Sequence, residues 1–163
     1  MLTSLSIRDV VLIEALDLSF HDGFTALTGE TGAGKSILLD SLGLAMGERA
    51  NAGLVRAGAA EARVSACFEA PAGHAVFTLL SEQGMPADTT DPIVLRRVIS
   101  REGRSRAWVN DQPVGLAVLR GIGTSPIEIQ GQQEQMGPAD SATHRGLLVA
   151  MNILTALTDC LLG

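Results

Sequence analysis

Lysine, tyrosine and tryptophan are almost missing from this 163-residue sequence. Lys35 is the only lysine among twelve basic residues, and the other eleven are arginines. There is no tyrosine and one tryptophan, so aromatic residues make up 3% of the chain. Eighteen acidic residues give a net charge of −6, which excludes a globally basic surface for nucleic acid but not a local basic patch. Because lysine occurs at one position only, the surroundings of Lys35 in the sequence are of particular interest.

The sequence also has few cysteines and no signal for export. Cys67 and Cys160 lie far apart and match no zinc spacing. No basic start precedes an apolar run of signal-peptide length, so we expect a cytoplasmic protein. Residues 146–163 are the one apolar stretch that resembles a membrane span. They are too short and contain Asn152 and Asp159, so we expect no stable membrane insertion.

The hydrophobic pattern predicts one domain of mixed α/β class, with strands concentrated near the start. Apolar residues make up 46% of the chain, enough for a buried core. Alternation and short apolar runs predict strands over residues 2–8, 11–20, 24–28, 62–69, 93–100, 104–109 and 126–130. Helical spacing predicts helices over residues 35–46, 71–83, 114–122 and 141–163. We expect residues 1–145 to form the main unit and residues 146–163 an apolar helical segment.

A glycine-rich loop lies between a predicted strand and a predicted helix. The loop matches G-x-x-x-x-G-K-[ST] at every fixed position and reads Gly29-Glu30-Thr31-Gly32-Ala33-Gly34-Lys35-Ser36. Backbone amides of such a loop, with the positive end of the helix dipole, bind phosphate oxygens. Lys35 would reach the β- and γ-phosphates, and the Ser36 hydroxyl would hold Mg²⁺. The alternative is a glycine-rich turn with a surface lysine, which the placement of the only lysine disfavours.

Three blocks of this sequence resemble the RecN family of DNA-repair ATPases. They are GFTALTGETGAGKSILLDSLGLAMGERA (residues 23–50), RSRAWVNDQPV (104–114) and IEIQGQQEQ (127–135). RecN is related to the SMC and Rad50 proteins of the ABC ATPase superfamily. The resemblance implies the N-terminal lobe of an ABC/SMC-type P-loop ATPase head, with an antiparallel β-rich subdomain next to the P-loop strand and helix. It also implies ATP and Mg²⁺ as cofactors, double-strand-break repair and recombination as the process, and association with the nucleoid.

By the same resemblance, Gln132 is the candidate Q-loop residue that contacts Mg²⁺ and the attacking water. A neutral amide can donate and accept there without adding charge. Gln130 and Gln133 stand where histidines are usual in the family, which casts doubt on any role that needs an imidazole. The alternative for this glutamine cluster is a polar surface loop.

The motifs that complete an ABC-type ATPase site are missing from the sequence. No apolar strand ends in Asp-Glu, and no Leu-Ser-Gly-Gly-like signature is present. In the family these motifs lie in a C-terminal lobe beyond a long coiled coil. We therefore expect the N-terminal lobe alone, with negligible hydrolysis and with the C-terminal lobe, the coiled coil and a second head as partners. A stand-alone P-loop kinase or phosphotransferase is the alternative, and a membrane-associated or adaptor domain is a third possibility.

Five arginines of one predicted hairpin are candidates for weak DNA contact. A solvated arginine-rich hairpin is at least as good an interpretation of these residues, which are Arg96, Arg97, Arg101, Arg104 and Arg106. For Trp108 we predict packing in the core. Arg8 and Asp9 end the first strand, where related ATPases contact the base or ribose, but a structural role is the favoured interpretation of both.

Overall fold

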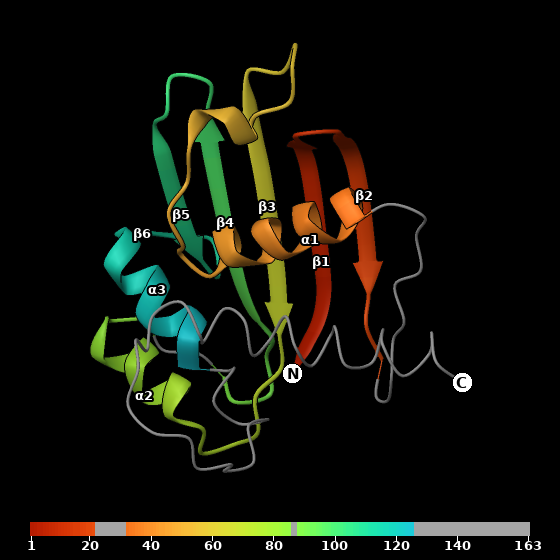
Figure 1. Cartoon of the computed structure of the whole chain (residues 1–163). Helices are drawn as coiled ribbons and strands as arrows, with labels where there is room; N and C mark the ends of the chain where they lie inside the picture. The colour runs from red at the N-terminus through yellow and green to blue at the C-terminus, as the bar shows by residue number, and fades with distance from the viewer. Residues whose placement is uncertain (22–31, 86–87, 126–163) are drawn as a thin grey trace, which may run out of the picture.

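The chain was analysed as a computed structural model that describes residues 1–21, 32–85 and 88–125 (Figure 1). The strands are β1 (Leu2–Val10), β2 (Ile13–Ser19), β3 (Glu61–Phe68), β4 (Ile93–Ser100), β5 (Ser105–Val109) and β6 (Gln112–Val114). The helices are α1 (Gly32–Ala45), the 3₁₀ turn η1 (Ala52–Leu54), α2 (Ala75–Glu82) and α3 (Leu116–Thr124).

All six strands form one antiparallel sheet in the order β2-β1-β3-β4-β5-β6. Their alternating sequences send one set of side chains to a buried face, as a period of two requires. On the three central strands this set includes Ile7, Val64 and Leu95, each 1% exposed or less. The opposite set is polar and rich in arginine and serine, so only one face of the sheet contributes to the core.

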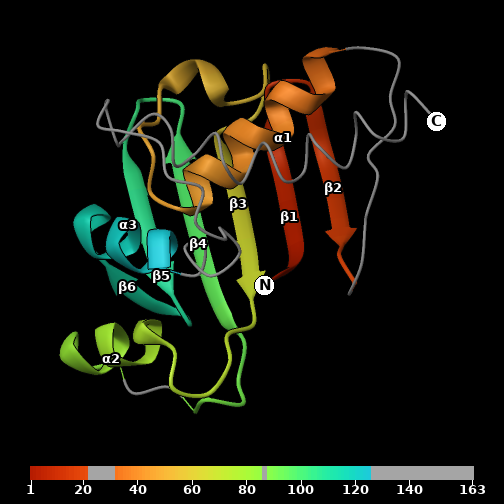
Figure 2. The same ribbon diagram turned by 60° about the horizontal axis from the view of Figure 1, so that its bottom comes forward.

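Helix α1 crosses the buried face of the sheet, over β1, β3 and β4 (Figures 1 and 2). Its first turns are partly exposed, whereas Leu42, Leu44 and Ala45 near its end are buried. Helix α3 packs beside β5 through Leu119 and Ile122, and α2 lies against α3 at one end of the sheet. The sheet and the three helices thus share one core, which anchors the C-terminal half of α1.

The predicted elements are largely confirmed within the described residues. The hairpin turn at 101–103 is present, and Gly103 has the positive φ of 83° that such a tight turn needs. Helix α2 begins later than predicted because His74 caps it, its Nδ1 accepting from the Val76 amide at 3.1 Å. The predicted strands 24–28 and 126–130 and the helix 141–163 lie outside the described residues, as does the boundary at 145.

One strand was not predicted. Residues 110–113 were expected to form a turn that leads into a helix from Val114. Instead Asn110 and Asp111 alone make a two-residue turn, with φ values of 47° and 65°, and β6 follows them. Asparagine and aspartate tolerate this left-handed backbone, and Pro113 fits an edge strand because no further strand needs its missing N–H.

Candidate functional site

Helix α1 begins inside the glycine-rich loop, at Gly32. Its first turn contains no acidic residue, so no carboxylate there neutralises the positive end of the helix dipole. A Cβ built on Gly34 would meet no atom within 4 Å among the described residues. Packing within that part of the chain therefore gives no reason for glycine at this position, and no described atom blocks the close approach of an anion to this backbone.

The phosphate-loop residues fall partly inside the described structure. Ser36 is exposed on the first turn of α1. Gly29, Glu30 and Thr31 lie outside the described residues, and the Lys35 side chain is not described. The structure also describes the helix that follows the loop: Gly34 and Ser36 near its start are exposed, and its other end is fixed in the core.

Arg97 fixes the C-terminal end of α1 to β4. The side chain is only 2% exposed. Its Nη1 donates to the carbonyl oxygens of Leu44 at 3.3 Å and Glu48 at 3.1 Å, and its Nε donates to Ser105 Oγ at 2.6 Å. A cation bonded to carbonyls at a helix C-terminus satisfies free acceptors and complements the helix dipole. Burial, followed by repulsion from Arg120, lowers the pKa of the Arg97 guanidinium.

Arg120 of α3 holds the same end of α1 from another side. Its Nε and Nη2 both donate to the Gly47 carbonyl, at 3.2 and 3.1 Å. Gly47 has a φ of 94°, and an added Cβ would lie 2.9 Å from the Arg120 backbone. Two arginines distant in sequence thus bind three carbonyls at and just beyond the end of α1, and this fixes the direction of the helix that follows the loop.

The structure divides the five candidate DNA-contacting arginines among three places. Arg97 points inward and is buried, so the prediction that it contacts DNA is wrong. Arg101 and Arg104 lie at the exposed β4–β5 turn. Arg96 and Arg106 lie on the outer face of the sheet, where Arg96 pairs with Asp111 at 3.1 Å.

Trp108 is not a core residue, contrary to the prediction. It lies on the outward side of β5, directly opposite Arg96, and is half-buried. The Arg96 guanidinium carbon is 4.9 Å from the ring centroid, and that of Arg106 is 5.7 Å away. Cation–π contacts with two arginines shield this ring on a polar face. The sequence did not predict the outward position of Trp108 because its apolar neighbours suggested a buried segment, but Ala107 and Val109 are the residues that occupy the inward positions.

Arg8 and Asp9 have structural partners, as the favoured interpretation predicted. Arg8 donates to the carbonyls of Ile7 and Leu16 and pairs with Asp17 at 2.6 Å. The hydrogen bond from Arg8 lowers the pKa of the Asp17 carboxyl. Asp9 has a φ of 53° and accepts the Arg56 amide at its carbonyl.

Other candidates cannot be placed. Gln132, the predicted Q-loop residue, and its neighbours lie outside the described residues. Within residues 1–21, 32–85 and 88–125, no group of three or more His, Cys, Asp or Glu side chains could hold a metal ion. In the same ranges, no helix has the length and apolar character that would let it cross a membrane.

Three residues with contacts of note in the structure, Arg120, Arg63 and Glu61, were not assigned a role from the sequence. Arg120 was not singled out, because nothing local marks a helix arginine as the partner of a distant carbonyl. Arg63 was placed on the predicted strand 62–69 and Glu61 just before it, and neither was given a role. The alternation in EARVSACF already puts both on the polar face of the sheet.

Comparisons with known proteins agree with this arrangement. The chain matches the family described as an AAA domain over residues 4–141. The DNA repair protein RecN of Bacillus subtilis (strain 168) is 42% identical over 149 residues, which cover 91% of this chain and 26% of that protein. RecN of Halalkalibacterium halodurans is 41% identical over 148 residues, with the same two shares. The chain thus spans about a quarter of the length of these relatives.

A solved structure supports the fold. The Smc head domain of Pyrococcus furiosus, solved with an extended coiled coil and the C-terminal domain of ScpA, has a TM-score of 0.61 to this chain. The match has 24% identity and covers 77% of this chain and 33% of that one. The fold is therefore that of the SMC-type ATPase heads, with mixed α/β structure and an antiparallel sheet. With most of its length matched, the chain belongs to the AAA domain family and corresponds within it to the N-terminal part of the RecN proteins.

Proposed function

We propose that this chain is the ATP-binding N-terminal lobe of a RecN-like protein that acts in double-strand-break repair and recombination. The observation that carries the proposal is the complete phosphate-loop sequence that runs into the start of helix α1, whose far end is held by Arg97. The loop amides would surround the phosphates, Lys35 would contact the β- and γ-phosphates, and Ser36 would hold Mg²⁺. The open backbone at Gly34 and the acid-free first turn fit such an anion.

Hydrolysis would need residues beyond this lobe. Bound Mg²⁺ would neutralise charge on the triphosphate, and Gln132 would orient the attacking water from its loop. The general base and the signature motif would come from a C-terminal lobe and from a second head. We propose head-to-head pairing of the intact protein around ATP, with DNA held by the assembled molecule.

The alternative of a stand-alone kinase or phosphotransferase has no support from the comparisons. The relatives are DNA repair proteins, and the structural neighbours are SMC heads. For this lobe, DNA contact would involve exposed arginines of the sheet, which include Arg96 and Arg106 of the original candidates, and not the buried Arg97.

Nucleotide titration of Lys35→Ala against the unchanged chain tests the proposal. We expect the unchanged chain to bind ATP with Mg²⁺, and the variant to lose about tenfold or more in affinity. The reason is that a charge-assisted bond to phosphate contributes about 1.5–3 kcal/mol. Isothermal titration calorimetry provides the measurement.

Arg49→Ala is the matched control, because it removes one exposed positive charge just beyond the other end of α1. Its affinity for ATP should stay within twofold of the unchanged chain. Equal binding by the Lys35→Ala variant and the unchanged chain would overturn the assignment of the loop.

A further inference from the structure

The outer face of the sheet carries a row of arginines that crosses four strands. Arg8 of β1 lies directly opposite Arg63 of β3, Arg63 lies opposite Val98 of β4, and Val98 lies opposite Arg106 of β5. We call Arg8, Arg63 and Arg106 the arginine row. With strands about 4.8 Å apart, the row extends over about 14 Å.

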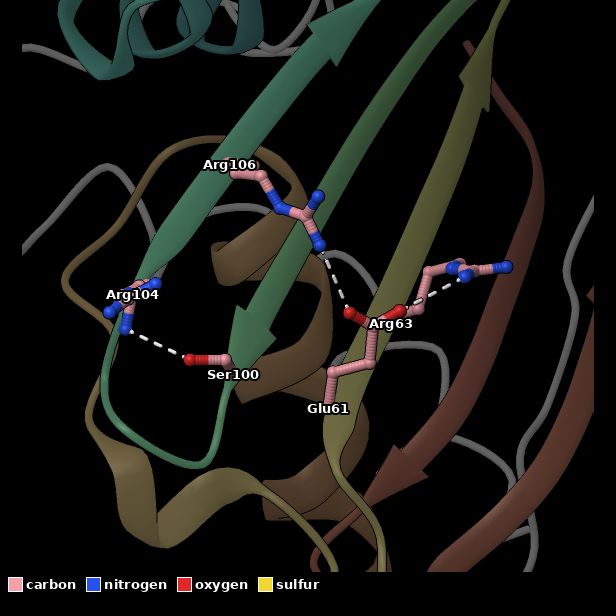
Figure 3. A network of polar contacts seen from close by, with 5 residues as sticks. All are labelled: Glu61, Arg63, Ser100, Arg104 and Arg106. Atoms are coloured by element: carbon pink, nitrogen blue, oxygen red, sulfur yellow. Dashed lines mark hydrogen bonds and ion pairs between the residues drawn. The ribbon is translucent and has the colours of Figure 1, made fainter.

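Without a bound anion, the side chains of the arginine row repel one another. Like charges directly opposite each other in a sheet repel, and Arg8 and Arg63 form such a pair. The carboxylates on this face only partly compensate, because Glu61 serves two arginines: it is 3.1 Å from Arg63 and 3.1 Å from Arg106 (Figure 3). With Arg96 included, four arginines on this face are paired with three carboxylates, which are Asp17, Glu61 and Asp111 of the β5–β6 turn.

The ion pairs of the row leave the arginines able to bind another anion. Between 39% and 64% of the side-chain surface of Arg8, Arg63 and Arg106 is exposed. Exposed ion pairs of this kind contribute little to stability, so phosphate can replace the carboxylates or share the guanidinium with them. Each guanidinium has five N–H donors; the ion pairs of Arg63 and Arg106 with Glu61 use one each, and Arg8 uses three for Ile7, Leu16 and Asp17.

Trp108 adds an aromatic ring next to the arginine row. Trp108 is half-buried beside Arg96 and Arg106, on the same side of the sheet. Between Arg63 and Arg106, Val98 is only 4% exposed, as expected where the aliphatic stems of flanking arginines cover a position. Guanidinium groups and the indole ring lie side by side on this face, and a nucleic-acid strand binds such cationic and aromatic groups.

The nearby β4–β5 turn is a weaker anion site. Glu102 lies between Arg101 and Arg104 in sequence, and the two cations contribute to the lowered pKa of its carboxyl, behind its hydrogen bond to Ser100. Arg101 also donates to the Arg56 carbonyl at 3.5 Å. The turn thus carries its own counter-charge, whereas the row shares one carboxylate between two cations.

We propose that the outer face of the sheet binds the phosphate backbone of DNA through Arg8, Arg63 and Arg106, with Arg96 and Trp108 at its border. The proposal rests on the proposed function only in taking DNA as the polyanion, and it does not require ATP to bind. Described helices α1 and α3 lie on the other face, so helix α1 and the proposed DNA surface occupy opposite sides of one sheet (Figure 2).

Anisotropy titrations of labelled 20-nucleotide single-stranded and duplex DNA with the full chain, at 50–200 mM salt, test the proposal. Arg63→Gln/Arg106→Gln should weaken binding about tenfold or more at low salt and reduce the slope of log K against log salt by about 2. Glu61→Gln should tighten binding several-fold, because it removes the shared competing carboxylate.

Arg101→Gln/Arg104→Gln is the matched control, since it removes two charges from the adjacent turn and should change affinity less than twofold. Circular dichroism melting checks that each variant is folded. No DNA binding by the unchanged chain, equal losses in the two double variants, or no gain in Glu61→Gln would each overturn the proposal. ATP titration of Arg63→Gln/Arg106→Gln should match the unchanged chain, so failure of the nucleotide site and failure of the DNA surface are measured separately.

Discussion

Arg96 and Arg97 are adjacent and chemically identical, yet the fold gives them opposite roles. Neighbouring residues of a strand point to opposite faces, and in IVLRRVIS the inward positions are Ile93, Leu95, Arg97 and Ile99. The alternation alone therefore predicts a buried Arg97. The partners of Arg97 could not be predicted, because Leu44 and Glu48 lie about fifty residues earlier and meet it only through the packing of α1 on the sheet.

At the residue scale, Arg97→Met should destabilise the fold by about 2–4 kcal/mol. The substitution keeps much of the side-chain volume but leaves the Leu44 and Glu48 carbonyls and the Ser105 hydroxyl without their donor. Urea unfolding followed by far-ultraviolet circular dichroism measures the loss. Arg96→Met is the control and should cost about 1 kcal/mol or less, since it removes a half-exposed ion pair and one cation–π contact. Equal losses in the two variants would contradict the role of Arg97.

At the element scale, the strands and helices follow from local patterns, while their junctions depend on tertiary contacts. Period-two alternation predicts β3 and β4 almost to the residue, and helical spacing predicts α1. The start of α3 was placed at Val114 because apolar residues begin there, but pairing of Val114 with Ala107 extends the sheet and delays the helix to Leu116. A strand of only three residues is too short for an alternating side-chain pattern to predict it.

Two glycines of α3 give a matched test of how this helix packs on the end of α1. A Cβ on Gly123 would lie 2.8 Å from the Met46 backbone, whereas a Cβ on Gly121 would meet nothing within 4 Å. Gly123→Ala should therefore destabilise by about 1–3 kcal/mol through overpacking. Gly121→Ala should stabilise by about 0.5–1 kcal/mol, because alanine is the better helix former. Urea midpoints that shift in the same direction for both variants would contradict the close approach of α3 and α1.

At the scale of the whole molecule, the two faces of the sheet carry different groups of residues. Its buried face holds the helix that begins in the phosphate loop, and its outer face holds the arginine row. The chain is acidic overall, so composition pointed away from nucleic acid, and only strand register showed that Arg8, Arg63 and Arg106 share a line. The phosphate loop, in contrast, is predicted from sequence alone, because the motif spacing is tied to a particular backbone geometry.

Because the chain contains a phosphate-loop motif but no Asp-Glu motif, we predict that the purified chain binds nucleotide without hydrolysing it. Phosphate transfer to water needs a metal-holding carboxylate and a base that orients the water, and no apolar strand followed by Asp-Glu exists in these 163 residues. Phosphate release from ATP with Mg²⁺ should therefore be the same for the unchanged chain and for Lys35→Ala, at the background rate, although only the unchanged chain binds ATP tightly. Turnover that depends on Lys35 would show that this lobe contains its own water-activating group, and the glutamines around Gln132 would then be the first to replace.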